Sequence, residues 1–124
     1  MEKTTSTKAQ QRLGRLAKAL AHPTRLQILH ILTQGEACVC HLMTVLGKRQ
    51  ANVSQHLTVL READLVVDRR EGLMVYYSLA DKRVAQIIAL LRELALDEGD
   101  VVFGAVPALP VPGCPCPKCA GADN

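Results

Sequence analysis

Residues 38–65, with the sequence CVCHLMTVLGKRQANVSQHLTVLREADL, decide the fold class. The spacing of the apolar residues predicts a short helix from about Cys38 to Leu46, stopped by Gly47, and a further helix over about 51–62. Two helices joined by a short turn that contains glycine form the helix-turn-helix pattern. The second helix carries an apolar stripe, and its polar residues fall largely off that stripe. The stripe consists of Val53, Leu57 and Leu60.

The segments on either side complete a recognisable order of elements. The segment around Leu13 to Leu20 has helical spacing, and AHPTRLQILHILTQG predicts a second helix with Pro23 in its first turn. The runs LVVDRR and LMVYYSL predict two strands joined at Glu71-Gly72, and Asp81 then caps a last amphipathic helix. We therefore predict a mainly α fold with a small β-hairpin: a winged helix-turn-helix in the order helix, helix, helix, helix, strand, strand, helix.

The apolar faces of the first and last helices exceed what so small a core can obviously cover. We therefore expect a homodimer through these two helices. Residues 1–98 are expected to form one DNA-binding and dimerisation domain. Beyond it lie five of the six prolines, so residues 99–124 are expected to form a flexible Pro- and Cys-rich tail.

The composition narrows the classes of function. A formal net charge of +3 over 124 residues permits binding to a polyanion without requiring it. No stretch resembles a secretion signal or a membrane span, so we expect a cytoplasmic protein with no membrane partner. With no Gly-rich phosphate loop and no nucleophile elbow, neither an enzyme nor a small organic substrate is expected. In the reducing cytosol, five cysteines in one small chain point to metal or redox chemistry.

The polar face of the helix over 51–62 has the residue types that read DNA. Asn and Gln pair bidentately with adenine in the major groove, and Asn52 and Gln55 lie one turn apart. Basic residues before this helix and beside the hairpin turn would contact phosphates. Alternatively, these polar residues merely form the solvated face of an amphipathic helix. The order of helix, turn, polar-faced helix and hairpin favours binding to double-stranded DNA. The predicted DNA-binding residues are Lys48, Arg49, Gln50, Asn52, Ser54, Gln55, His56, Arg69 and Arg70.

Three runs together resemble the ArsR/SmtB family of metal-sensing transcriptional repressors over roughly residues 10 to 96. These runs are HPTRLQILHIL, EACVCHLMTVLGKRQANVSQHLTVLREADLV and RREGLMVYYSL. The resemblance implies a dimeric winged helix-turn-helix repressor that leaves its operator when a metal or metalloid binds. It does not identify the ion.

Cys38 and Cys40 begin the short helix, where the exposed amides and the dipole favour thiolates that bind soft ions. Residues two apart lie about 200° round an ideal helix, so joint binding of one ion requires the first turn to unwind or shift. Such a change would move the DNA-reading helix. His41 follows directly; it is either a nitrogen ligand or a solvent-facing residue, and the second is favoured.

Two thiolates are too few for a tight site, because arsenic(III) and antimony(III) take three and zinc or cadmium usually takes four ligands. Family members of the arsenic-sensing type often have a third cysteine where this chain has Met43. The remaining thiols, in the tail, either share a site with the first pair, form a separate site or have no role in sensing. The candidate metal ligands are therefore Cys38, Cys40, Cys114, Cys116 and Cys119.

Arsenite or antimonite is the favoured inducer, with cadmium, lead and zinc as alternatives. A repressor of the same fold that senses oxidants or persulfides through these thiols is the second interpretation. A metal carrier is the third, and it does not need the polar face of the helix over 51–62.

Overall fold

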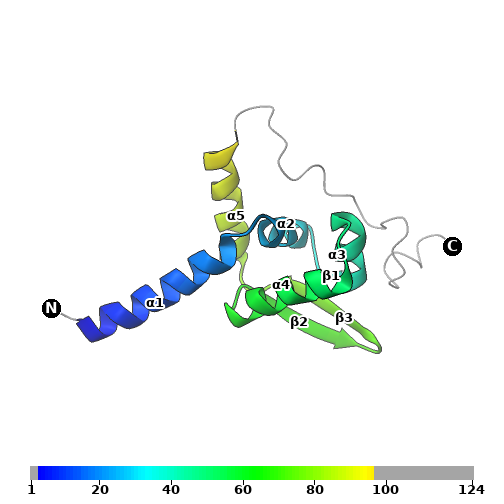
Figure 1. Cartoon of the computed structure of the whole chain (residues 1–124), viewed down its shortest axis with the longest axis horizontal. Coiled ribbons are helices and arrows are strands. Elements are labelled where there is room, and N and C mark those ends of the chain that lie inside the picture. Colours follow the sequence, from blue (N-terminus) through cyan, green and yellow to red (C-terminus); the bar gives the residue numbers. More distant parts are fainter. Residues whose placement is uncertain (1–2, 97–124) are drawn as a thin grey trace.

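The computed structural model describes residues 3–96, and in that range the chain forms five helices and one three-stranded antiparallel sheet (Figure 1). The predicted order of helices and the predicted hairpin are confirmed. The tail predicted over 99–124 lies outside the described residues. The elements are α1 (Lys3–Leu20), α2 (Pro23–Leu32), β1 (Ala37–Cys38), α3 (Val39–Leu46), α4 (Gln50–Glu62), β2 (Val66–Glu71), β3 (Met74–Leu79) and α5 (Lys82–Ala95).

The helix-turn-helix consists of α3 and α4. Gly47 ends α3 in the left-handed conformation, with φ of 66°, and its amide donates to the Met43 carbonyl at 2.8 Å. Such a cap favours glycine because a side chain is strained at positive φ. The predicted stripe of Val53, Leu57 and Leu60 is fully buried and fixes how α4 lies on the core.

The second helix begins where the sequence predicts. His22 is extended, and its Nδ1 accepts a hydrogen bond from the Thr24 amide at 3.1 Å, while Pro23 takes the first helical position. At the other end α2 stops at Leu32, with Thr33 as its C-cap, and Gly35 follows three residues after the end of the helix.

The sheet contains one strand more than the predicted hairpin. β1 pairs with β3, so the strand order is β1-β3-β2, and Cys38 lies opposite Tyr76. The hairpin turn is Gly72-Leu73 and not Glu71-Gly72, because Glu71 still pairs with Met74. β1 therefore ties the start of α3 to the wing.

The two helices predicted to dimerise leave apolar residues uncovered in the single chain. Val84 and Ile88 of α5 are buried in the core, but Leu94 is 86% exposed and Leu13 of α1 is 68% exposed. In Figure 1, α1 projects from the body of the fold on the side opposite the tip of the hairpin. Among the described residues, no helix combines the length and the apolar character that crossing a bilayer requires.

Candidate functional site

The outer face of α4 presents most of the predicted DNA-binding residues to solvent. Asn52 and Gln55 are exposed one turn apart, Ser54 is half-buried beside them, and Arg70 is exposed on β2. Lys48 and Arg49 before the helix, and Gln50 at its first position, are also exposed. The start of α4 thus presents polar and basic side chains to solvent.

His56 differs from the prediction because it points inward. Its residue is only 9% exposed, and its ring lies 4.4 Å, centroid to centroid, from the ring of His22. Burial, reinforced by the charges of His22, Arg25 and Lys48, lowers the pKa of this imidazole. His56 follows Val53 by three residues and precedes Leu60 by four, so it shares the buried face of the helix. His56 therefore does not belong to the exposed polar face of α4 on which the other predicted DNA-binding residues of this helix lie.

Arg69 differs from the prediction in another way, because its side chain is held on the protein. Its Nη2 atom lies 2.6 Å from Glu36 Oε1, and its Nη1 atom lies 3.0 Å from Glu71 Oε2. The guanidinium carbon also stands 5.0 Å from the centroid of the Tyr76 ring. The hydrogen bonds that Arg69 donates to Glu36 first, and then to Glu71, raise the pKa of its guanidinium. Arg70 thus remains the wing's candidate phosphate contact.

The Sγ atoms of Cys38 and Cys40 lie 2.6 Å apart. The prediction that a helix separates these thiols is wrong, because Cys38 is extended in β1 and only Cys40 belongs to α3. Cys38 is 1% exposed and caps α3, its Sγ accepting the His41 amide at 3.3 Å. Cys40 is partly exposed. Both sulfur atoms can therefore reach one ion without unwinding of the helix.

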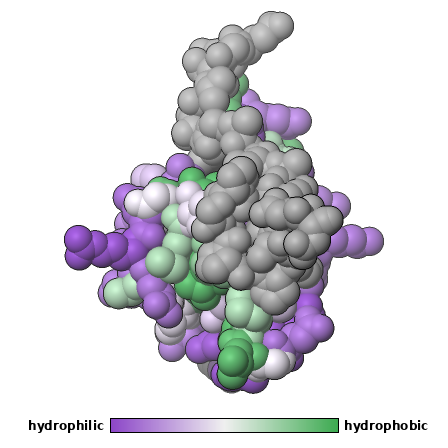
Figure 2. All heavy atoms as spheres, turned by 90° about the vertical axis from the view of Figure 1, so that its right-hand side faces the viewer, coloured by the Kyte–Doolittle hydropathy of each residue, from purple (hydrophilic) through white to green (hydrophobic). Residues whose placement is uncertain are grey.

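A pocket of about 280 Å³ opens beside this thiol pair. The pocket lies where the end of β1, the first turns of α3, the first residue of α4 and the turn of the wing with β3 come together. Figure 2 shows the molecule from the side on which α3 and the tip of the hairpin lie in Figure 1, and hydrophobic patches are visible there beside hydrophilic residues. The pocket is lined by Cys38, Val39, Cys40, Met43, Gln50, Leu73, Met74 and Val75. We call it the thiol pocket.

The described residues supply only part of a metal site. Within residues 3–96, no third His, Cys, Asp or Glu side chain joins the thiol pair to form a group that could hold an ion. His41 is buried, 4% exposed, so the expectation that it faces solvent is wrong, and burial lowers the pKa of its imidazole. Its amide donates a hydrogen bond to Cys38 Sγ. Cys114, Cys116 and Cys119 lie outside the described residues.

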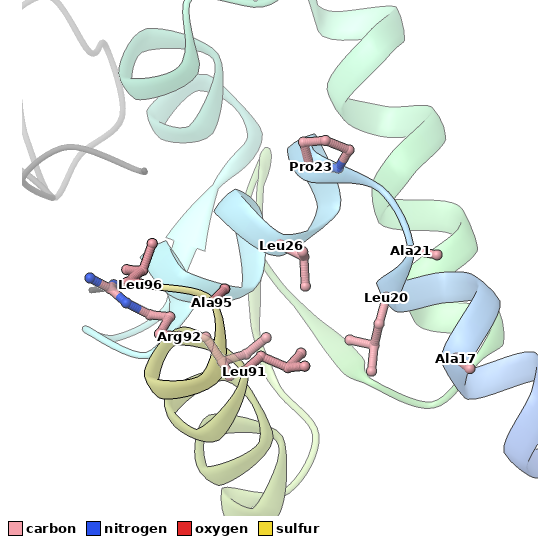
Figure 3. Close-up of a pocket in the computed structure, with 10 residues that line it drawn as sticks. Ala17, Leu20, Ala21, Pro23, Leu26, Leu91, Arg92, Ala95 and Leu96 are labelled. Carbon is pink, nitrogen blue, oxygen red and sulfur yellow. The ribbon is translucent and has the colours of Figure 1, made fainter. Parts of the chain in front are cut away.

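A second pocket, of about 510 Å³, lies between α1, α2 and α5 (Figure 3). Leu20 of α1, Leu26 of α2 and Leu91 of α5 contribute apolar walls, and Arg92 is its one charged lining residue. Arg92 Nη1 lies 2.8 Å from Nδ1 and 2.6 Å from Nε2 of His30. Burial and this cation together lower the pKa of His30. The apolar pocket continues the uncovered surface of the two outer helices.

A turn between two helices, a polar outer face on the second of them and a hairpin wing directly after it define a winged helix-turn-helix regulator that binds DNA. The model of the arsR family of bacterial regulatory proteins matches residues 22–67, which include α2, α3 and α4. The chain belongs to this family.

Three similar proteins illustrate the range of the family. An uncharacterised HTH-type transcriptional regulator of Methanocaldococcus jannaschii is 40% identical over 85 residues, 68% of this chain and 96% of the relative. The arsenical resistance operon repressor of Escherichia coli is 47% identical over 66 residues, 52% of this chain and 56% of the relative. The solution structure of a homodimeric winged helix-turn-helix domain from Mycobacterium bovis has a TM-score of 0.69 at 38% identity, covering 73% of this chain and 83% of that one.

Proposed function

We propose that this protein is a metal(loid)-responsive repressor that binds operator DNA as a homodimer and leaves it when a thiophilic ion binds Cys38 and Cys40. The observation that carries the proposal is the position of the thiol pocket. Its walls include Gln50, the first residue of the recognition helix α4, and Leu73 in the turn of the wing. An ion bound to the thiols would thus touch both parts of the fold that meet DNA.

Operator recognition in this proposal uses the exposed face of α4. Asn52 and Gln55 read base edges in the major groove, Ser54 and Gln50 assist them, and Lys48, Arg49 and Arg70 contact phosphates. His56 is left out because it is buried, and Arg69 contributes by positioning the wing.

Dimerisation covers the pocket between α1, α2 and α5 with a second copy of the chain. The apolar lining and the exposed Leu13 and Leu94 favour this occupant over solvent. The Mycobacterium bovis structure is described as homodimeric, which supports the same arrangement. Two-fold symmetry would place the two α4 helices about 34 Å apart, one turn of DNA, on a palindromic operator.

Ion binding would link two elements through the thiol pair. Cys38 is held in the sheet opposite Tyr76, and Cys40 stands on α3. The two sulfur atoms are neighbours, so one ion could bind both. The bonds to the ion would fix the start of α3 against the wing and would thereby change the placement of α4.

Arsenite and antimonite are the proposed inducers, and cadmium, lead and zinc are the alternatives. The name of the Escherichia coli relative supports the choice of an arsenical. A trivalent ion takes a third thiolate, and we assign it to the cysteine cluster at 114–119. Couplings between two binding sites are commonly about 1–3 kcal/mol, which is about 5- to 150-fold in operator affinity.

The experiment uses a fluorescently labelled fragment of the protein's own promoter. Anisotropy is followed while arsenite, antimonite, cadmium, lead or zinc is added to wild-type protein and to the C38S/C40S variant. We expect the variant to bind the promoter with wild-type affinity and to stay bound at every ion concentration. Matched C114S/C116S/C119S protein tests the tail. Release of the C38S/C40S variant by an ion would show that another site is the sensor.

A thiol-based redox repressor is the second candidate, and the proximity of the two sulfur atoms favours it. A two-electron oxidant such as peroxide would convert the two thiols to a disulfide, with the peroxide reduced to water. Promoter release by peroxide in the presence of a metal chelator would support this function over metal sensing, because the chelator removes the ion but not the oxidant.

A further inference from the structure

We propose that the thiol pocket takes a monovalent soft cation, Cu(I) or Ag(I), on a mixed donor set of two thiolates and two thioethers: Cys38, Cys40, Met43 and Met74. This inference rests on the proposed function, because it uses the same pair of thiols. It adds the two methionines as ligands and a second class of inducer that does not depend on the tail.

Met43 is placed toward the thiols by the helix that carries Cys40. It follows Cys40 by three residues on α3, so the two side chains share one face of the helix and both line the pocket. Its carbonyl accepts the amides of Gly47 and Lys48 at 2.8 and 3.3 Å. The backbone of this residue is therefore fixed by the cap of α3, and only its flexible side chain needs to move.

Met74 approaches from the wing. It opens β3 and shares a strand face with Tyr76, which lies opposite Cys38. Met74 and Cys40 both pack against the buried cluster of Cys38 and Tyr76. β1 and β3 are antiparallel, so the chain that leaves β1 after Cys38 runs toward Met74, the first residue of β3. This direction brings Cys40 to the same side as Met74. The pocket thus has sulfur side chains on two walls, α3 and β3.

The chemistry of the donors selects the ion. The chain has only three methionines, and two of them line this pocket. A thioether is a neutral, soft donor that suits Cu(I), whereas arsenic(III) and zinc are held by thiolates or by nitrogen and oxygen ligands. Within residues 3–96, no group of three or more His, Cys, Asp and Glu could hold a metal ion, whereas two thioether sulfur atoms line the same pocket as the thiols.

The binding reaction also accounts for release from DNA. Two neutral thiols and one monovalent cation give a bis-thiolate complex of charge −1 and two protons, and the thioethers add no charge. This negative charge would lie beside Gln50 and the turn of the wing. A phosphate backbone would be repelled there, and the Met74–ion bond would draw the wing toward α3.

The test observes the methionines directly. Full-length reduced protein with 13C-labelled methionine methyl groups is titrated with Ag(I), which is a stable analogue of Cu(I). We expect the methyl signals of Met43 and Met74 to shift until the thiols are saturated, while that of Met1 stays in place as an internal control. If the thiols saturate and neither methyl signal moves, the thioethers are not ligands.

Affinity provides the second measurement. Cu(I) binding is measured by anaerobic competition with a chromophoric Cu(I) chelator for four proteins that all carry C114S/C116S/C119S, so that Cys38 and Cys40 are their only thiols: the parent, M43L, M74L and M43L/M74L. Leucine keeps the pocket apolar at similar volume, so the variants should remain folded. We expect the double variant to lose about tenfold or more in Cu(I) affinity, as is typical when the surroundings of a metal are disturbed, and nothing in arsenite affinity.

Unchanged Cu(I) affinity in the M43L/M74L variant would overturn the proposed donor set but leave the thiol switch standing. Loss of Cu(I) binding by the C114S/C116S/C119S variant would also overturn it, because the pocket would then depend on the tail. A different result would contradict the proposed function: release of the C38S/C40S variant from the promoter when an ion is added.

Discussion

Cys38 lies opposite Tyr76 across β1 and β3, so one thiol of the candidate sensor belongs to the same sheet as the wing. The other thiol, Cys40, belongs to the helix that packs against the recognition helix. Arg69 strengthens this connection by reaching from β2 to Glu36, two residues before Cys38. The proposed ion site and the proposed DNA-binding surface are thus connected through a short path of direct contacts.

Operator specificity should depend on the exposed amides of α4. Replacing Gln55 with Ala should weaken binding to the operator by about 1–3 kcal/mol and leave non-specific binding nearly unchanged. The exposed Thr58, one turn further along, provides a control variant, T58A, which is expected to have a smaller effect. Anisotropy with specific and scrambled duplexes measures both affinities. Equal losses of Q55A affinity on both duplexes would contradict base reading by this residue.

Two neighbouring arginines of the wing should differ in their contribution to salt dependence. Arg70 is exposed, whereas Arg69 is paired with Glu36 and Glu71. Each phosphate contact contributes about 0.9 to the slope of log K against log salt concentration. R70A should lower that slope by about 0.9 for each subunit that contacts DNA, and R69A should lower it less. A larger change in R69A would show that Arg69 leaves its carboxylates to contact DNA.

Stability should fall as the pH drops below about 6.5, the ordinary pKa of histidine. Burial lowers the pKa of His56 in the folded state, so the unfolded chain binds its proton first on acidification. The loss of stability begins near pH 6.5 and levels off below the folded pKa. In H56Q the decline should be smaller, since only His30 and His41 then contribute in the same direction. Urea unfolding at pH 8 and pH 5.5 measures the difference, and an equal decline in both proteins would contradict it.

Asp81 should stabilise the protein at neutral pH through its contacts with Arg83. The Arg83 side chain, and then its amide, lower the pKa of Asp81 to about 2. Its charge therefore adds stability above the ordinary pKa near 4, and this contribution disappears as the pH falls through 2. D81N keeps a capping side chain but removes the charge, so it should be less stable than wild type at pH 7 and equal to it near pH 2. NMR titration of the carboxyl carbon checks the pKa itself.

Dimerisation should depend on the apolar pocket of α1, α2 and α5. L91E places a charge in the lining of this pocket and should give monomers in sedimentation velocity, with weaker operator binding. L73E is the matched control for the sedimentation measurement alone, because Leu73 is 99% exposed, lies outside that pocket and belongs to the wing, where a charge would itself alter operator binding. A dimeric L91E protein would place the interface elsewhere.

The sequence predicted the helix-turn-helix because its signals are periodic and have a clear stop. Val53, Leu57 and Leu60 follow the helical repeat, and Gly47 has the φ that only glycine adopts easily. His56 fits the same repeat, but its polar side chain suggested an outer position. In α4, the helical spacing of a residue therefore predicts whether it is buried more reliably than its polarity does.

The geometry of the thiols was missed because it depends on one residue at a helix boundary. β1 has only two residues, too few to produce an alternation that can be recognised in the sequence. Once Cys38 belongs to this strand rather than to α3, its sulfur turns toward Cys40 instead of away from it. Long-range pairing with β3, which sequence spacing does not encode, decides this.

The central claim is that filling the thiol pair releases DNA. In the C114S/C116S/C119S variant, Cys38 and Cys40 are the only thiols, so cadmium–thiolate absorption reports their occupancy alone. Absorption and anisotropy of the labelled promoter are recorded in the same titration. We predict that anisotropy falls in step with the rise in absorption. Saturated absorption with the promoter still fully bound would contradict the account.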